Sequence, residues 1–326
     1  MEAPVAPAAS ARSAGLLIAS GRRVFSFVAT LAGAVLLAQL LLWLAPGDAV
    51  DIVTDDPELR AAMIAEWGLD QPVLVRYAGF VSRALTGDLG TSLTYRPGQP
   101  VAELLGPASA RSLALVFGAL VTSLLWGVGL AYATAGRRSL ARRLVQVLSV
   151  APVFLLAWLL MITLNETTFS LMEAGRISRP GWFALPDENS AVKTTLAVLV
   201  LACGSSALTE VHAAAEDALT RIRRSGYVDA ARARGAPLWP IVLLNLAPPL
   251  SSLAASRAAF FVGGLVIIEK VLHLNGVGAM LWQACRMRDY PLALGITVVA
   301  AAAVCGARLT ADLVRVSLDP RLRESG

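Results

Sequence analysis

The sequence has little charge and very little lysine or histidine. Only 16% of its 326 residues are charged, while 56% are hydrophobic; a soluble domain has roughly a quarter of charged residues. Lys193 and Lys270 are its only lysines, and His212 and His273 are its only histidines. A composition this poor in charge excludes an ordinary soluble domain and indicates that the protein is surrounded by lipid.

The shortage of lysine, histidine and cysteine also excludes several kinds of site. A phosphate-binding loop ends in Gly-Lys, but the two lysines follow Val192 and Glu269, so the chain has no such loop. The two histidines lie far apart and no cysteine cluster accompanies them, which argues against a metal site. We therefore expect no catalytic residues, no metal ligands and no cofactor in this chain.

Long hydrophobic runs are what the sequence has instead. Four uncharged stretches come close to or exceed the roughly 18 residues that cross a bilayer, namely 24–46, 112–136, 144–165 and 290–307. Two more are interrupted: 194–209 is short until it is extended past Glu210, and 239–268 contains Arg257. The sequence therefore predicts an all-α integral membrane protein with about six transmembrane helices.

Arginine falls on one side of these predicted spans. The basic segments are the one before the first span, with Arg12, Arg22 and Arg23, and the loops around residues 137–143 and 221–234. Segment 47–106 instead has an excess of acidic residues. Because cytoplasmic loops are rich in Lys and Arg, both termini are predicted to be cytoplasmic and segment 47–106 external. Topology thus explains the net charge of +5, and nucleic-acid binding is not expected.

These patterns divide the chain into segments. We expect a cytoplasmic tail at 1–20, a first transmembrane helix at 21–46 and a small external cap at 47–106. Within the cap, Pro and Gly separate short amphipathic stretches such as 72–85. We expect a transmembrane core at 107–323, with a second external loop at 166–190, and a cytoplasmic tail at 324–326.

The cytoplasmic segment 213–240 is longer than a simple connector needs to be. It contains Tyr227, Asp229, Ala230, Ala231, Arg232, Arg234 and Gly235 in sequence order. The small alanines leave a thin helix that can enter a groove of a partner, the charged residues offer contacts, and Gly235 permits a left-handed turn that ends the helix. We expect this segment to present one or two short helices to a cytoplasmic partner.

Several motifs resemble one known family when they are taken together. Asp229-Ala230-Ala231 with Gly235, and then Pro248, resembles the coupling motif of ATP-binding-cassette importer permeases. The external segment is similar to that of the first, B-type permease subunit in dipeptide, oligopeptide and nickel importers. Its matching pieces are Gly68–Pro72, Arg76-Tyr77, Gly87–Ser92 and Pro100-Val101, with Pro46-Gly47-Asp48, Asp289-Tyr290-Pro291 and Leu318–Arg321 elsewhere in the chain.

This resemblance implies a type I importer permease that works as a mechanical part. Its expected partners are a second permease subunit, two ATPase subunits that hold ATP and Mg²⁺, an extracytoplasmic solute-binding protein and the lipid of a bacterial inner membrane. Peptides, nickel or metal chelates and other small solutes stay open as substrates. An ion-coupled secondary transporter and an intramembrane enzyme are the alternative functions, although no internal repeat favours the first.

The chain departs from the family pattern at a few positions. Gly226 stands where an acid is usual, Asn275 where proline is common, and Arg257 where the family has an apolar or amide residue. An arginine near the middle of a span needs a partner or a wet cavity. Arg257 therefore either pairs with a carboxylate, such as Glu210, Asp312 or one on the partner permease, or lines a translocation path together with Phe260 and Phe261.

Overall fold

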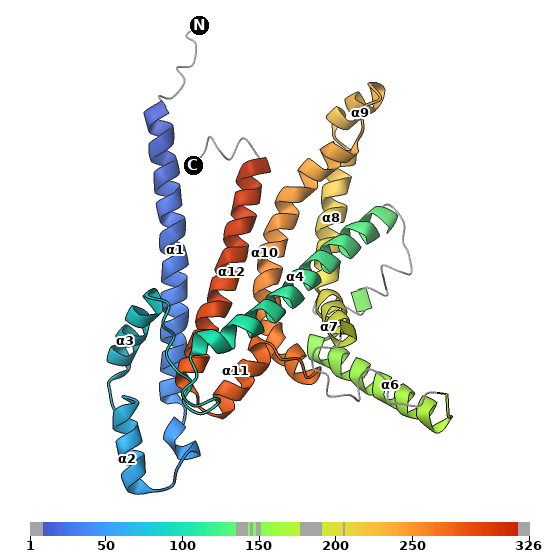
Figure 1. Ribbon diagram of the computed structural model, residues 1–326. Coiled ribbons are helices and arrows are strands. Elements are labelled where there is room, and N and C mark those ends of the chain that lie inside the picture. Colours follow the sequence, from blue (N-terminus) through green and yellow to red (C-terminus); the bar gives the residue numbers. More distant parts are fainter. Residues whose placement is uncertain are drawn as a thin grey trace.

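The computed structural model describes residues 9–134, 143, 146–147, 151–176, 191–204 and 206–318. In this part of the chain every regular element is a helix, apart from one isolated β-bridge between Thr91 and Pro100 (Figure 1). The all-α prediction is confirmed. The elements in order are α1 (Ala9–Leu44), η1 (Ala49–Ile52), α2 (Pro57–Glu66), α3 (Val73–Leu85), α4 (Val101–Thr134), α6 (Val153–Glu173), α7 (Ala191–Cys203), α8 (Ala207–Arg223), α9 (Gly226–Ala233), α10 (Trp239–Val271), α11 (Val277–Arg286) and α12 (Tyr290–Leu318).

Five helices are long and apolar enough to cross a membrane, and the bent pair α7–α8 makes a sixth if it is one span. About six spans were predicted, and this number is confirmed. This pair covers the predicted fourth span, and its two helices meet at an angle of 53°. Gly204 lies at the break, where a Cβ atom would come within 2.4 Å of Val153 Cγ2 on α6.

The predicted boundary between cap and core at 106/107 falls inside a helix. Helix α4 begins at Val101 and continues through Pro107 to Thr134. The carbonyl oxygen of Pro100 accepts hydrogen bonds from the backbone N–H groups of Glu103 and Leu104, so the first turn forms directly after Pro100. The second span therefore starts within the segment assigned to the cap.

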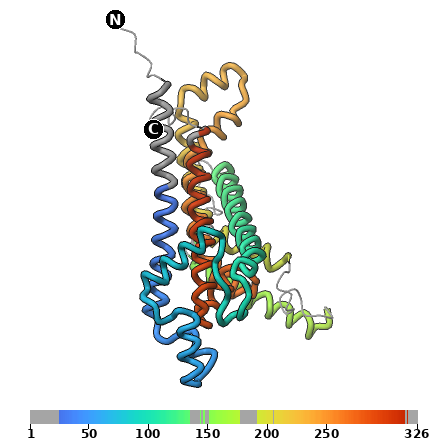
Figure 2. The backbone as a smooth tube through the Cα atoms, turned by 60° about the vertical axis from the view of Figure 1, so that its left-hand side comes forward, coloured from blue at the N-terminus to red at the C-terminus, as the bar shows by residue number. Residues whose placement is uncertain are grey.

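The helices are arranged so that the two ends of the molecule differ. The N-terminal end of α1, the C-terminal end of α12 and helix α9 lie at one end, whereas α2, α3 and α11 lie at the other (Figures 1 and 2). Within the cap, the predicted amphipathic stretch 72–85 is helix α3, and it packs beside α1 through the buried Phe80. The basic loop around Arg137 and residues 177–190 of the predicted second external loop lie outside the described residues.

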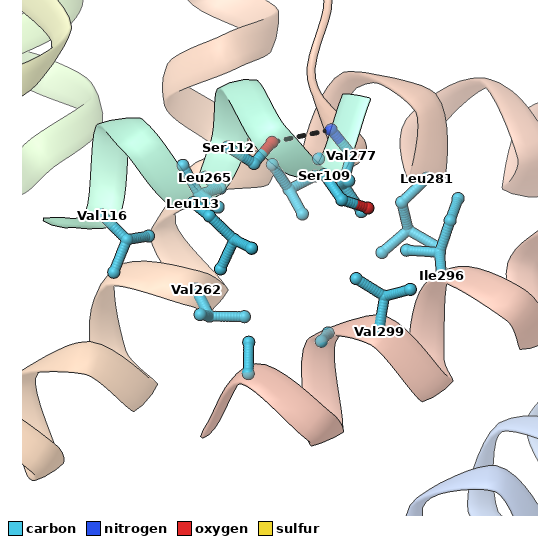
Figure 3. A pocket seen from close by; sticks show the side chains of 14 residues that line it. Ser109, Ser112, Leu113, Val116, Val262, Leu265, Val277, Leu281, Ile296 and Val299 are labelled. Carbon is cyan, nitrogen blue, oxygen red and sulfur yellow. Dashed lines mark hydrogen bonds between the residues drawn. The ribbon is translucent and has the colours of Figure 1, made fainter. Parts of the chain in front are cut away.

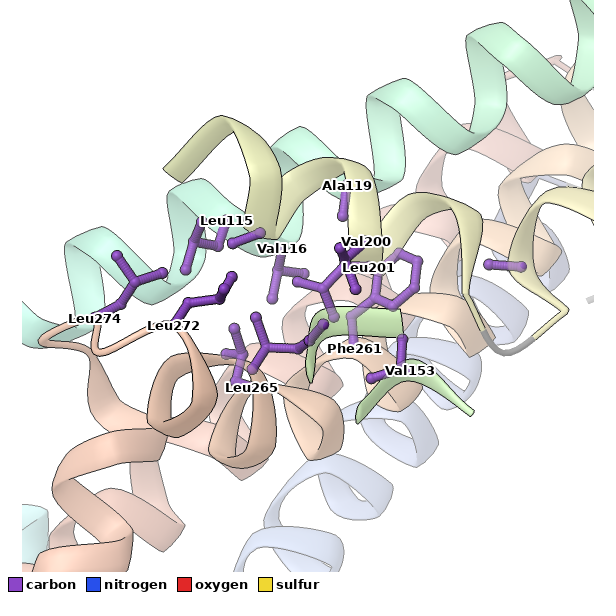
Figure 4. Packing of buried hydrophobic residues seen from close by; sticks show 14 of the residues in the cluster. Leu115, Val116, Ala119, Val153, Val200, Leu201, Phe261, Leu265, Leu272 and Leu274 are labelled. Atoms are coloured by element: carbon purple, nitrogen blue, oxygen red, sulfur yellow. The ribbon is translucent and has the colours of Figure 1, made fainter. Parts of the chain in front are cut away.

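The main core lies where α4, α6, α7 and α10 meet (Figure 4). Phe261, Leu201 and Ile268 are fully buried there, and small residues such as Ala119 lie between the larger side chains. Helices α4 and α8 also approach each other closely, because a Cβ atom at Gly127 would come within 2.4 Å of Val211 Cγ1. Small residues that let helix backbones approach are the usual means of packing helices in lipid.

Candidate coupling surface and outer-end network

Helix α9 forms the tip of the molecule at the end where α8 and α10 meet (Figures 1 and 2). Its eight residues bury Val228 and Ala231, which are 3% and 1% exposed. Tyr227, Asp229, Ala230, Arg232, Arg234 and Gly235 are all exposed. The segment predicted to contact a cytoplasmic partner is therefore a separate short helix with one face on the protein and the rest uncovered.

The end of α9 forms the left-handed turn that was predicted at Gly235. Gly235 has φ +67°, its N–H group donates to the carbonyl oxygen of Arg232, and the N–H group of Ala236 donates to that of Ala231, both at 3.0 Å. These two hydrogen bonds make a Schellman motif, which satisfies carbonyl groups that the end of a helix leaves open. Gly235 thus fixes how the chain leaves α9 for α10.

The charges on α9 are available to a partner. Arg232 Nη1 lies 3.6 Å from Asp229 Oδ1, but the two side chains are 57% and 72% exposed. An exposed pair of this kind contributes little to stability, so pairing with each other does not explain both residues. Arg234 is exposed as well. The surface offers one carboxylate and two guanidinium groups beside Tyr227, which is 48% exposed.

Helix α8 connects α9 to the bundle through polar contacts as well as packing. Arg257 on α10 forms an ion pair with Glu210 on α8, one of the two carboxylates considered for it. Thr134 Oγ1 at the end of α4 lies 3.1 Å from His212 Nε2 on α8. These two contacts hold α8 to both of its neighbours, α10 and α4.

The predicted path residues fall in different surroundings. The Arg257 guanidinium lies 5.5 Å from the centre of the Phe260 ring, and Phe260 is 45% exposed. Phe261 is 0% exposed and belongs to the core cluster, so it has no surface to offer a solute in this conformation. We correct the assignment of Phe261 to the packing of the bundle, whereas a path role for Arg257 and Phe260 stays a prediction.

At the opposite end, Asp289 holds the cap onto the bundle. Its side chain is fully buried, and Oδ2 accepts hydrogen bonds from Ser92 Oγ at 2.5 Å and from the backbone N–H groups of Leu93, Thr94 and Tyr95 at 3.0–3.1 Å. Oδ1 accepts from the N–H group of Leu292 in the first turn of α12. A buried carboxylate is stable only with such a set of donors.

The neighbouring residue Arg288 joins a third segment to the same place. Its Nη1 donates to Asp51 Oδ2 at 2.9 Å and to the carbonyl oxygen of Asp48 at 3.1 Å. The backbone N–H group of Asp48 and the Arg60 guanidinium hold the pKa of Asp51 below its ordinary value. Three segments that resemble the family separately, around residues 47, 92 and 289, are therefore in contact in the fold.

Glu269 is the centre of a second buried network of hydrogen bonds. It is 0% exposed; Oε1 accepts from Ser112 Oγ at 2.6 Å and Oε2 from the N–H group of Ala279 at 3.0 Å. Ser112 Oγ also accepts from the N–H group of Val277 at 2.8 Å, next to a small apolar cavity of about 50 Å³ (Figure 3). The network ties α4, α10 and α11 together.

Sequence reasoning missed both carboxylates. Asp289 belongs to the Asp289-Tyr290-Pro291 motif, but its hydrogen-bond partners lie nearly two hundred residues away in the sequence. The sequence signal for Glu269 lies at Gly276. A Cβ atom at Gly276 would come within 2.1 Å of Glu269 Oε1, so only glycine leaves room for the carboxylate. Within the described residues, no group of three His, Cys, Asp or Glu side chains could hold a metal ion.

The sequence is similar to those of known membrane transport proteins over most of its length. Residues 108–324 match the family described as binding-protein-dependent transport system inner membrane component. The chain is 29% identical to a peptide permease protein of Brucella ovis, over 88% of this chain and 93% of the relative. It is 27% identical to the glutathione transport system permease protein of Salmonella typhimurium, over 93% and 97%.

A further relative is the oligopeptide transport system permease protein of Mycobacterium bovis, with 30% identity over 93% of this chain and 98% of the relative. These matches extend over almost the whole chain, so they include the cap as well as the core. The chain therefore belongs to the family of binding-protein-dependent transport system inner membrane components, as a permease of the dipeptide and oligopeptide group of ATP-binding-cassette importers.

Proposed function

We propose that this chain passes peptides or peptide-like solutes across the bacterial inner membrane as one of two permease subunits of an ATP-driven importer. The relatives named above are permeases for peptides, oligopeptides and glutathione, and this supports a peptide-like solute over nickel. The chain itself is a non-enzymatic membrane subunit, and ATPase activity lies in separate subunits. ATP and Mg²⁺ are accordingly placed on those partners.

The observation that carries the proposal is the geometry of α9. Its exposed charged residues stand beyond the bundle at one end, and the cap with the Asp289 network lies at the other end. With α9 in the cytoplasm, both termini are cytoplasmic and the cap faces the solute-binding protein. Closure of the ATPase dimer then moves α9 as a rigid body, and α8 and α10 transmit the movement to the spans.

An ion-coupled carrier is the alternative from another class. Such a carrier needs a titratable acid that opens to the solute path. Glu210 is paired with Arg257, and Glu269 on α10 accepts hydrogen bonds from Ser112 and Ala279, so both of these acids are already engaged. These contacts favour structural roles for both acids and support the ATP-driven function.

Crosslinking tests the contact between α9 and an ATPase subunit. In a chain whose Cys203, Cys285 and Cys305 are replaced by serine, Ala230→Cys should form a crosslink of short reach with an ATPase subunit in the assembled complex. The matched control is Thr86→Cys, an exposed position at the end of α3 in the cap. If the Thr86 cysteine reacts with the ATPase and the Ala230 cysteine does not, the orientation and the coupling role are both wrong.

A further inference from the structure

A polar cleft opens at the outer end of the bundle, between the first half of α4, the α10–α11 connection and α11. Its volume is about 660 Å³. Its cationic lining residues are Arg96, Arg111 and Lys270, and its acidic ones are Glu103 and Glu269. One of the only two lysines in the whole chain is thus found here. Five of the chain's 51 charged residues therefore line this cleft.

Glu269 is buried at the edge of the cleft and exposes no surface to it. Its carboxylate is fully buried and receives the Ser112 hydroxyl and the Ala279 N–H group. Gly276 covers it so closely that a Cβ atom there would overlap the carboxylate. The two cationic residues that flank this part of the cleft, Arg111 and Lys270, are exposed and make no ion pair among the described residues.

Arg111 is positioned across the cleft by one hydrogen bond. Its Nη1 donates to the carbonyl oxygen of Asn275 at 2.8 Å, and a guanidinium has further N–H donors in a fork that fits a carboxylate. A second hollow of about 260 Å³ shares Arg111, Asn275 and Gly276 with the first. Arg111 therefore lines both hollows, and a group bound in either one can contact its guanidinium.

We infer that Arg111 and Lys270 receive a carboxylate of the solute as it enters the permease, and so select peptides with a free C-terminus. The inference rests on the proposed function and names the feature of the solute that the outer cleft recognises. Arg257 was the sequence-based candidate for this task, but its guanidinium is paired with Glu210. Arg111 and Lys270 are exposed, which suits a transient contact because water screens the pair and the solute can leave.

Uptake of two matched peptides tests the inference. Complexes carrying Arg111→Gln or Lys270→Gln are reconstituted with their ATPases and solute-binding protein, and uptake of trialanine is compared with uptake of trialanine amide. Dividing each variant's rates by the wild-type rates cancels the preference of the binding protein. We expect each variant to lower the relative uptake of trialanine about fivefold more than that of the amide. Arg111→Lys, which keeps the charge, should retain part of the preference.

The control is Arg286→Gln, which removes an exposed cation from the end of α11 outside the cleft lining. It should leave the ratio of the two peptides unchanged. If the Arg111 and Lys270 variants lower both peptides equally while complex yield and basal ATPase activity stay normal, the cleft contacts the binding protein or another acidic surface, and the inference is wrong. If the wild-type complex imports neither peptide, it is the proposed function that fails.

Discussion

Gly278→Ala should reduce the yield of assembled complex by about tenfold, although it adds a single carbon atom. A Cβ atom at this position would lie 2.6 Å from the main-chain carbonyl carbon of Leu265 and from the main-chain nitrogen of Val266. Both atoms belong to α10, so relief requires α11 to move away from that helix. Overpacking of this kind costs about 1–3 kcal/mol, and 1.4 kcal/mol is a factor of ten. Such a movement would also pull Ala279 away from Glu269.

Gly263→Ala is the matched control for this effect. It makes the same change in α10 at an exposed position, where an added Cβ atom meets nothing within 4 Å. Alanine is the better helix former by roughly 0.5–1 kcal/mol, so this variant should assemble at least as well as the wild type. The yield of assembled complex extracted in detergent can be measured by size-exclusion chromatography. Equal yields for the two variants would show that α11 is not packed against α10 in this way.

Gly235→Val should lower coupled transport by about tenfold or more while leaving the protein in the membrane. The turn after α9 has φ +67°, and a β-branched residue there costs about 1–2 kcal/mol, because its Cβ atom crowds the backbone. The Schellman hydrogen bonds from Gly235 and Ala236 would be lost with the turn. Helix α9 would then no longer leave for α10 at a fixed angle, and closure of the ATPases would not reach the spans.

The control for this variant lies at the other end of the same helix. Gly226 is the first residue of α9, has no positive φ, and an added Cβ atom there meets nothing within 4 Å. Gly226→Val should therefore keep most of the uptake, whereas Gly235→Val should lower uptake and solute-stimulated ATPase activity by about tenfold or more. Normal stimulation in the Gly235 variant would mean that the turn is not needed for coupling.

Local signals were enough to predict α9 and its end. Gly235 follows a run of small and charged residues, and its left-handed turn depends only on its immediate neighbours in the chain. The amphipathic stretch that became α3 was predicted for the same reason. Hydrophobic runs likewise predicted the spans, because the length of a transmembrane helix is set by the bilayer.

Contacts between distant segments could not be predicted in this way. The Asp289 network joins residues on α12 and in the loop before α4, and Glu269 needs the space left by Gly276. Neither partner is visible from the local sequence of the other. The same limit explains Phe261: its neighbours on α4 and α7 decide that it is buried, whereas the adjacent Phe260 is half-exposed on the same helix.

Arg257 shows both the use and the limit of sequence reasoning. The cost of an arginine in a span made it a residue to explain, and Glu210 was one of the carboxylates considered. The ion pair with Glu210 is present, so the structure supplies a partner on α8. The charge of Arg257 alone could not distinguish pairing with Glu210 from a position on the translocation path. Which of the two occurs depends on how α8 packs against α10.

Reconstituted uptake is the most direct test of the account as a whole. The complex of this chain with the second permease and the ATPases is placed in proteoliposomes with ATP and Mg²⁺ inside and the solute-binding protein with labelled trialanine outside. We predict accumulation that requires ATP and the binding protein and is unchanged when a protonophore and ionophores dissipate ion gradients. Accumulation that continues without ATP and stops when an ion gradient is dissipated would contradict it and would favour a secondary transporter.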